Sequence, residues 1–289
     1  MKPAAYEYHR AYTVEEVVSL LDELGEDAKI LAGGQSLAPM MNFRLARPSA
    51  LVDVMRIAGL DHIRREGDEL HVGALARHRA VETSRDPGVL EGFGLLPRAA
   101  RWIGHYPIRA RGTVGGSIAH SDPTAEWCLL ARLFDARIVV QGPAGQREVP
   151  AQEWFGGFLT TASDPGEMVV ETRFTRPRGH GAMTEYARRR GDFAIAAVGL
   201  AFDVVDGRFS DVGIVLGGVA ATPVRASEAE SILEGAAVDG DAVVEASRAA
   251  AADLNPPSDL NGDAAYRRHL VENLTRRGVA EALAVGATR

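Results

Sequence analysis

Two glycine pairs, each followed within two residues by a serine, constrain the fold of this chain more than any other feature of its sequence. The first lies in Ala-Gly-Gly-Gln-Ser at 32–36, directly after a short apolar run, and the second in Thr-Val-Gly-Gly-Ser at 113–117. Glycine accepts a positive φ and has no Cβ, so successive N–H groups can converge on an anion. Each pair alone is more simply a turn that needs glycine for its geometry. Two in one chain favour a long ligand with a diphosphate at its middle.

The residues by themselves do not name that ligand. Neither segment has the G-x-G-x-x-G spacing of a dinucleotide site or the G-x-x-x-x-G-K-[ST] spacing of a P-loop. The histidines are scattered, and the single cysteine, Cys128, cannot by itself hold an iron–sulfur cluster, which takes several thiolates. No nucleophile elbow is present. We therefore predict a phosphate-bearing cofactor, no metal site and no catalytic side chain in this chain.

The N-terminal part is predicted to be a helix between two strands. Thr13 and Glu16 form a capping box, the apolar residues that follow have helical spacing, and Gly25 suits the end of that helix. Residues 29–32 and 51–54 are apolar enough to be short buried strands. Next come a strand at 69–74 and helices near 76–84 and 97–103, whereas 109–117 is expected to be irregular. A helix from Pro123 to about 134 and a strand at 136–141 complete this part.

A boundary is predicted at residues 176–179, where prolines and glycines alternate with arginines. Beyond it, strands are expected at 197–205 and 212–219. A second capping box at Ser227 and Glu230 opens a helix to about 233, and further helices are predicted at 242–252 and 264–284. The order of elements is that of an α+β fold with a small C-terminal domain of strands followed by helices.

Charge and composition exclude some classes of function and location for this chain. A net charge of −7 and a pI of about 5.7 oppose binding to nucleic acid. The first residues are polar, and no apolar run approaches the roughly 20 residues of a membrane span. With one cysteine, a reducing compartment fits, so we expect a cytoplasmic, soluble protein. Cys128 and the three tryptophans (Trp102, Trp127, Trp154) are interpreted as core, and the pair Arg267-Arg268 as a solvated face.

The glycine segments resemble the motifs of one family when they are taken with the rest of the chain. Residues 31–37, followed by Pro39, and residues 112–117 are similar to the paired motifs of the medium subunit of molybdenum hydroxylases. This family includes carbon monoxide dehydrogenase and the flavin domain of xanthine dehydrogenase. The resemblance covers nearly the whole chain in order, including residues 44–48, 51–54, 73–74, 188–194 and 216–226.

The resemblance implies a two-part FAD-binding fold of the vanillyl-alcohol-oxidase/PCMH type, followed by a small C-terminal domain of a sheet and helices. The FAD-binding domain would span residues 1–176, with subdomains of about 1–57 and 58–176. The C-terminal domain, of the carbon monoxide dehydrogenase flavoprotein type, would span residues 177–289.

The same resemblance implies which residues bind FAD, since the two glycine segments hold its pyrophosphate and ribityl chain in the family. Carried over, the cofactor-binding residues are Leu31, Ala32, Gly33, Gly34, Gln35, Ser36, Leu37, Ile103, Thr113, Gly115, Gly116, Ser117, Glu126, Asp192 and Phe193. Glu126 is alternatively a helix-first-turn glutamate favoured by the helix dipole. Phe193, implied to lie near the isoalloxazine ring, is alternatively a core residue on a strand. His120 contacts a phosphate or the flavin edge, or is structural.

The resemblance further implies an electron-transfer subunit. The molybdenum cofactor and the [2Fe–2S] clusters would sit on a large and a small partner subunit, in a dimer of heterotrimers, and electrons would pass through FAD to an external acceptor. Two alternatives stay open: a free-standing FAD-dependent oxidoreductase and a non-enzymatic flavin-binding assembly module. The organic substrate and the final acceptor are not specified by this sequence.

Overall fold

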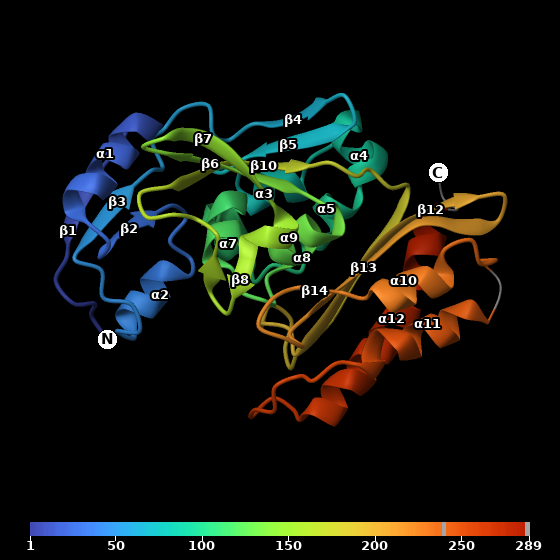
Figure 1. The fold of residues 1–289 in the computed structure, drawn as a ribbon. Coiled ribbons are helices and arrows are strands. Elements are labelled where there is room, and N and C mark those ends of the chain that lie inside the picture. The colour runs from blue at the N-terminus through green and yellow to red at the C-terminus, as the bar shows by residue number, and fades with distance from the viewer. Residues whose placement is uncertain (239–240, 287–289) are drawn as a thin grey trace.

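The computed structural model describes residues 1–238 and 241–286, so residues 287–289 of the predicted C-terminal domain lie outside the described part. Figure 1 shows three lobes in chain order: a small N-terminal lobe, a central lobe, and a C-terminal layer of sheet and helices. The N-terminal lobe has three parallel strands in the order β1-β3-β2. Its elements are β1 (Glu7–Arg10), α1 (Val14–Leu24), β2 (Ala28–Leu31), α2 (Leu37–Asn42) and β3 (Ala50–Asp53).

Helix α1 occupies the predicted residues because its ends are specified locally. The Thr13 hydroxyl accepts a hydrogen bond from the N–H of Glu16 at 3.2 Å, and the Glu16 carboxylate accepts one from the N–H of Tyr12 at 2.6 Å. Gly25, at φ 76°, ends the helix. The two strands predicted in this lobe are β2 and β3, each one residue earlier than expected.

The central lobe is a five-stranded antiparallel sheet in the order β4-β5-β10-β6-β7, with helices packed against it (Figure 1). Helix α1 packs against β6 and β10 through a cluster that contains Val17, Val139 and Val170. The strands are β4 (Ile63–Glu66), β5 (Glu69–Gly73), β6 (Arg137–Gly142), β7 (Gly145–Pro150) and β10 (Met168–Phe174), with a separate pair β8 (Phe155–Gly157) and β9 (Thr160–Thr161). The helices are α3 (His78–Glu82), α4 (Pro87–Phe93), α5 (Leu95–Ala99), α6 (Tyr106–Arg111), α7 (Val114–His120), α8 (Glu126–Leu133) and α9 (Ala151–Trp154).

Two expectations for the central lobe are wrong. Residues 109–117, predicted to be irregular, end α6 and begin α7. The Thr113 hydroxyl caps α7 by accepting a hydrogen bond from the N–H of Gly116 at 3.1 Å, and this cap offsets the low helix propensity of the two glycines. Pro123 lies before α8 rather than in its first turn, because a turn closed by the Asp122 carboxylate on the N–H of Thr124 comes first.

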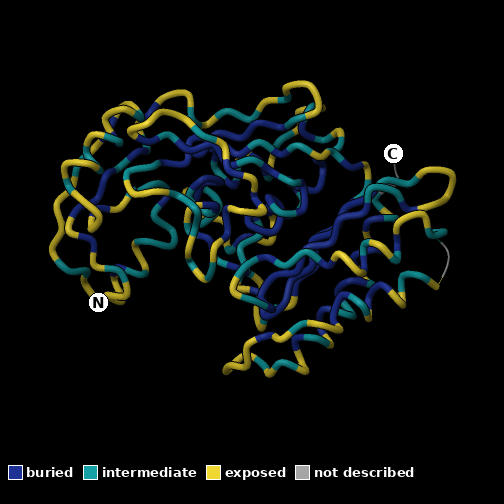
Figure 2. Tube along the Cα trace, in the orientation of Figure 1, coloured by how far each residue is buried: buried dark blue, intermediate teal, exposed yellow. Residues whose placement is uncertain are grey.

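The C-terminal sheet is antiparallel in the order β11-β12-β13-β14 and is buried on both faces, as the dark blue strands in Figure 2 show. Ala197 and Ala201 of β12 face the core of the central lobe, whereas Val198 and Leu200 face the C-terminal helices. The elements are β11 (His180–Tyr186), β12 (Ala196–Val205), β13 (Arg208–Gly217), β14 (Val224–Arg225), α10 (Ser227–Leu233), α11 (Ala242–Ala252) and α12 (Ala264–Gly286).

Two side-chain expectations fail in this domain. Ser227 is the first helical residue of α10 rather than its cap, and Glu230 instead accepts a hydrogen bond from the N–H of Ile214 at 2.7 Å. Arg267 is 4% exposed rather than solvated, and its guanidinium donates to the carbonyl oxygens of Ile195 and Gly218. A periodic helix pattern cannot reveal these contacts, because the partners Ile214, Ile195 and Gly218 lie in or beside strands of the C-terminal sheet, 16 to 72 residues away in the sequence.

The predicted boundary at 176–179 is a tightly bonded crossing between the central lobe and the C-terminal sheet. Arg178 is fully buried at its side chain and donates to the carbonyl oxygen of Leu133 at 2.6 Å and to Asp211 of β13. Arg176 pairs with Asp135 and Asp211. These bonds fix the C-terminal sheet against α8. None of the described helices is both long and apolar enough to cross a membrane.

Candidate cofactor site

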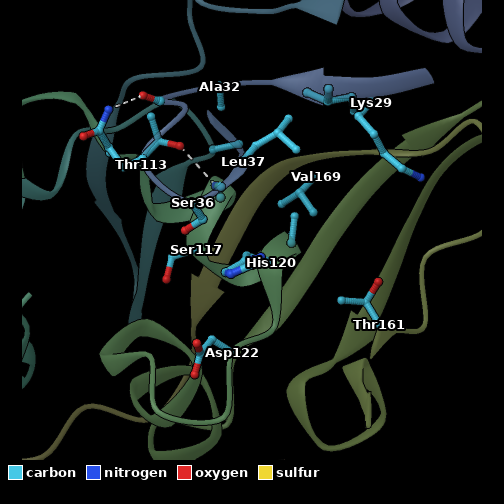
Figure 3. A pocket seen from close by; sticks show the side chains of 18 of the residues that line it. Lys29, Ala32, Ser36, Leu37, Thr113, Ser117, His120, Asp122, Thr161 and Val169 are labelled. Carbon is cyan, nitrogen blue, oxygen red and sulfur yellow. Dashed lines mark hydrogen bonds between the residues drawn. The ribbon is translucent and has the colours of Figure 1, made fainter. Parts of the chain in front are cut away.

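A cavity of about 910 Å³ lies where the three lobes meet, at the upper end of the range of small-molecule sites. The turn between β2 and α2, helix α7 and residues 191–194 of the C-terminal domain all contribute to its lining. Figure 3 shows Ser36 from the first glycine segment and Ser117 from the second in this one cavity. The structure thus brings together two segments that are some 80 residues apart, as the pairing of the motifs predicts.

The first glycine segment leaves its backbone donors free. Gly34 has a φ of 70°, and the N–H groups of residues 33–36 donate to no acceptor among the described residues. The Gln35 amide donates to the carbonyl oxygen of Gly33 at 2.8 Å, which fixes the turn. Consecutive free N–H groups at the end of a strand form an anion-binding nest.

The second glycine segment differs from the first because its donors are already used. The N–H of Val114 donates to the carbonyl oxygen of Ala76 at 2.9 Å, and that of Gly115 to Ala74 at 3.0 Å. The N–H of Gly116 donates to the Thr113 hydroxyl. The expectation that both segments offer the same nest is therefore wrong. The second segment supplies a small-residue floor and the hydroxyl of Ser117, with no free N–H groups in its first turn.

Gly33 is glycine because of a close approach between the two segments. A Cβ on Gly33 would lie 2.4 Å from the carbonyl oxygen of Arg111 and 2.7 Å from the Cα of Gly112. Gly115 packs just as closely against Ala74, because a Cβ on Gly115 would lie 2.5 Å from the Cβ of Ala74. Glycine at 33 lets the first segment lie directly against Arg111 and Gly112, just before α7, and glycine at 115 lets α7 lie against Ala74, so both segments face one cavity.

A polar wall lies beside α7 and at the start of α8. The pKa of Glu126 is raised from 4.5 to about 7, mainly by burial and also by the charge of Asp122, while a hydrogen bond from its own backbone N–H and the charge of Arg109 oppose the change. Burial also lowers the pKa of His120, against the opposing charge of Asp122. Both side chains line the cavity, so burial favours the uncharged forms of both in this wall.

His78 forms the end of the cavity behind Gly112 and makes a pH-dependent contribution to stability. The Trp127 indole N–H donates to His78 Nδ1 at 2.9 Å, and burial lowers the pKa of His78 from 6.5 to about 4, helped by the charges of Arg77 and Arg109. The unfolded chain takes up this proton first as the pH falls. We therefore expect the His78 contribution to be complete above pH 6.5 and to fall by about 3 kcal/mol towards pH 4.

The test is urea unfolding of the wild type and of His78→Gln at pH 7, 5.5 and 4. The free-energy difference between them should shrink by about 3 kcal/mol from the highest to the lowest pH. His269→Gln, at an exposed position of α12, is the matched control and should keep the wild-type pH dependence. A constant difference for His78→Gln would contradict the assignment. Glu126, whose pKa is raised, contributes in the opposite direction: its contribution is lost as the pH rises from 4.5 to about 7.

Residues 191–194 close the cavity from the C-terminal domain. Phe193 is 74% exposed and lines the cavity, so the alternative that it is a core residue on a strand is wrong. Asp192 lies next to it, and Ile103 lines the cavity from the end of the α5 segment with 9% of its surface exposed. An exposed aromatic side chain at the opening of a cavity is available to a flat ligand.

All predicted cofactor-binding residues line this cavity except Leu31, which ends β2 with its side chain beneath Gly34. The sequence analysis did not single out residues 163–169, the loop before β10 and the first residues of that strand, which also line the cavity. Trp127 and Trp154 are buried as predicted, but Trp102 is 37% exposed and lies outside the core. Cys128 is buried, as predicted. Among the described residues, no group of three or more histidine, cysteine or acidic side chains is placed to hold a metal ion.

Two known family models match successive parts of the chain. Residues 4–175 match the FAD binding domain in molybdopterin dehydrogenase, and residues 182–282 match the CO dehydrogenase flavoprotein C-terminal domain. The chain belongs to the FAD-binding subunits of the molybdenum hydroxylases. The predicted family, the α+β fold and the FAD cofactor are thereby confirmed.

Several proteins of this family match the chain over almost its whole length. The carbon monoxide dehydrogenase medium chain of Hydrogenophaga pseudoflava is 38% identical over 98% of this chain and 99% of its own. The 6-hydroxypseudooxynicotine dehydrogenase complex subunit alpha of Paenarthrobacter nicotinovorans is also 38% identical, over 98% of this chain and 96% of its own. The solved carbon monoxide dehydrogenase of H. pseudoflava superposes with a TM-score of 0.94 at 38% identity, and covers 98% of this chain and 99% of its own.

The cavity fits FAD in shape and chemistry. Free N–H groups at residues 33–36 suit a pyrophosphate, and the close packing that Gly33 and Gly115 allow holds the segments on either side of the cavity in place. The polar wall suits the hydroxyl groups of a ribityl chain, and an aromatic ring at the opening suits a flavin. As a member of this family, the chain is a subunit of an oxidoreductase.

Proposed function

We propose that this chain is the electron-transfer subunit of a cytoplasmic molybdenum hydroxylase. In this proposal the molybdenum cofactor lies on a large partner subunit, the [2Fe–2S] clusters lie on a small one, and two such heterotrimers associate. The observation that carries the proposal is the full-length match to medium chains, with 98% of this chain and 99% of the relative aligned. The chain has one cysteine, so other chains must supply cluster ligands.

We further propose roles for the cavity residues. The free N–H groups of residues 33–36 hold the pyrophosphate, Thr113 and Ser117 face the ribityl chain, and Phe193 contacts the flavin ring. When bound, FAD accepts and releases electrons, which no protein side chain does as readily. The chain positions the cofactor, and the bonds of Val114 and Gly115 to Ala76 and Ala74, just after β5, keep the floor of the site rigid. No acid or base from this chain is required for electron transfer.

The domain division belongs to the same proposal. We place the boundary at about residue 176, with subdomains of 1–57 and 58–176 in the FAD-binding domain. The two family matches end at 175 and begin at 182, which supports this position. The three-stranded parallel sheet ends at Asp53, which agrees with the division of the first domain.

Purification of the full chain with an affinity tag from its native host tests the proposal. We expect FAD, molybdenum and iron in the complex, with two further polypeptides in equal amounts. The isolated chain loaded with FAD should be reduced by dithionite and reoxidised by an external acceptor, but should not oxidise an organic substrate. Turnover of an organic substrate by the isolated chain would instead support the free-standing oxidoreductase, and a chain with FAD but without metal-bearing partners would support the assembly module.

A further inference from the structure

A second cavity, of about 550 Å³, lies against the flavin cavity. The two share Gly191 and Asp192 as a common wall. The segment after α5 lines it from one side, and the end of β11 with the arginine run that follows lines it from the other. Its volume is within the range of small-molecule sites, so the space suits a ligand smaller than FAD.

Three guanidinium groups around this cavity have no partner in the protein. The side chains of Arg101, Arg189 and Arg190 make no hydrogen bond or ion pair with any described residue. Arg188 differs, because it donates to the carbonyl oxygen of Leu260 and does not line the cavity. In a chain of net charge −7, a concentration of unpaired positive charge at a cavity favours an anionic ligand. Guanidinium groups bind phosphate and carboxylate in pairs of hydrogen bonds.

The same cavity also offers aromatic surface. Trp102 and Tyr186 line it and are 37% and 42% exposed, while Trp127 and Trp154 are fully buried. Tyr186 is held in place by an edge-on contact with Tyr266, at 6.1 Å between ring centres. Exposed indole and phenol rings beside arginine side chains provide a stacking surface for a flat ring.

The wall of the cavity contains a buried polar group without a partner. Glu185 is 9% exposed, and its Oε1 makes no hydrogen bond in the described part of the chain. Burial raises the pKa of Glu185 well above its usual value, and the nearby Glu126 adds to the effect. This shift favours the uncharged form of the carboxyl. A buried polar atom without a hydrogen-bond partner lowers the stability of the fold unless a ligand or a water molecule forms a hydrogen bond with it.

We propose that this second cavity binds a small planar aromatic anion, with its ring against Trp102 and its phosphate or carboxylate group between Arg101 and Arg189. The occupant is not FAD, because these side chains line only the smaller cavity. Since Gly191 and Asp192 separate the two cavities, the bound anion lies directly beside the flavin site. The proposal does not depend on which partner subunits the chain has.

Calorimetric titration of the full chain, saturated with FAD, tests this site with 2-naphthyl phosphate as the probe. We expect a Kd below about 1 mM for the probe. Its two halves, 2-naphthol and inorganic phosphate, should each bind at least about tenfold more weakly, because each uses only part of the site. Phosphate binding as tight as that of the whole probe would overturn the aromatic part of the proposal, and absence of probe binding would overturn all of it.

The double variant Arg101→Gln/Arg189→Gln should raise the Kd of the probe by about tenfold or more while it keeps FAD at full stoichiometry. Both positions are exposed and unpaired, so the fold should not change. Arg248→Gln, an exposed arginine on α11 that lines neither cavity, is the matched control and should bind the probe like the wild type. Unchanged binding in the double variant, equal weakening in the control, or loss of FAD from the double variant would each refute the second site.

Discussion

The Gly33→Ala variant is expected to lose FAD and to be less stable than the wild type by about 2–3 kcal/mol. One methyl group is sufficient because it would lie 2.4 Å from the carbonyl oxygen of Arg111 and 2.7 Å from the Cα of Gly112. Both are backbone atoms, which cannot rotate away as a flexible side chain can. The first glycine segment must therefore move away from the start of α7, and its N–H groups then leave the pyrophosphate site.

The measurement is the flavin content of the purified variant, together with its unfolding free energy in urea. The Kd for FAD should rise by at least about tenfold. Gly156→Ala is the matched control: Gly156 lies in β8 without a positive φ, and a Cβ there would lie 3.8 Å from its nearest neighbour. It should change stability by no more than about 0.5 kcal/mol and keep FAD. A Gly33→Ala protein with full flavin content would show that the packing of the two segments is not required for the site.

The second large effect is expected at Arg267 on α12. Arg267→Leu should lower the unfolding free energy by about 3–5 kcal/mol, because two buried carbonyl oxygens lose their donor. These are the carbonyl groups of Ile195 and Gly218, which the Arg267 guanidinium joins at 2.5 and 2.8 Å. Ile195 comes just after Phe193, so the loss should also loosen the rim of the flavin cavity and weaken FAD binding.

Thermal and urea unfolding of Arg267→Leu, with flavin absorbance after dialysis, measure both effects. Arg277→Leu on the same helix is the control, because Arg277 is 48% exposed at its side chain and, within the described part of the chain, pairs only with Glu281 one turn away. Such an exposed pair contributes about 0.3–0.5 kcal/mol. If the two variants were equally stable, the buried contacts of Arg267 would not hold the C-terminal helix to the sheet.

Local signals in the sequence predicted the elements whose ends are fixed by neighbouring residues. Helix α1 begins at its Thr13 cap and ends at Gly25 as expected, since both bonds span only a few residues. Helix α11 also has the predicted bounds, 242–252. The prediction that residues 113–117 are irregular is wrong because their helical state depends on Ala74 and Ala76. The carbonyl oxygens of these two residues, almost 40 positions earlier in the chain, accept the first N–H groups of α7.

Through its resemblance to a known family, the sequence predicted the family, the FAD cofactor and a set of binding residues of which all but Leu31 line the cavity, because these depend on short motifs whose chemistry is local. Only the tertiary structure decided how the two glycine segments differ. The first keeps free N–H groups, whereas the second donates them to Ala74 and Ala76, just after β5, and to the hydroxyl of Thr113. It also decided that Phe193 is exposed, that Arg267 is buried and that three unpaired arginines surround a second cavity. Burial and pairing are set by residues that meet only when distant elements pack, so no local pattern in the sequence records them.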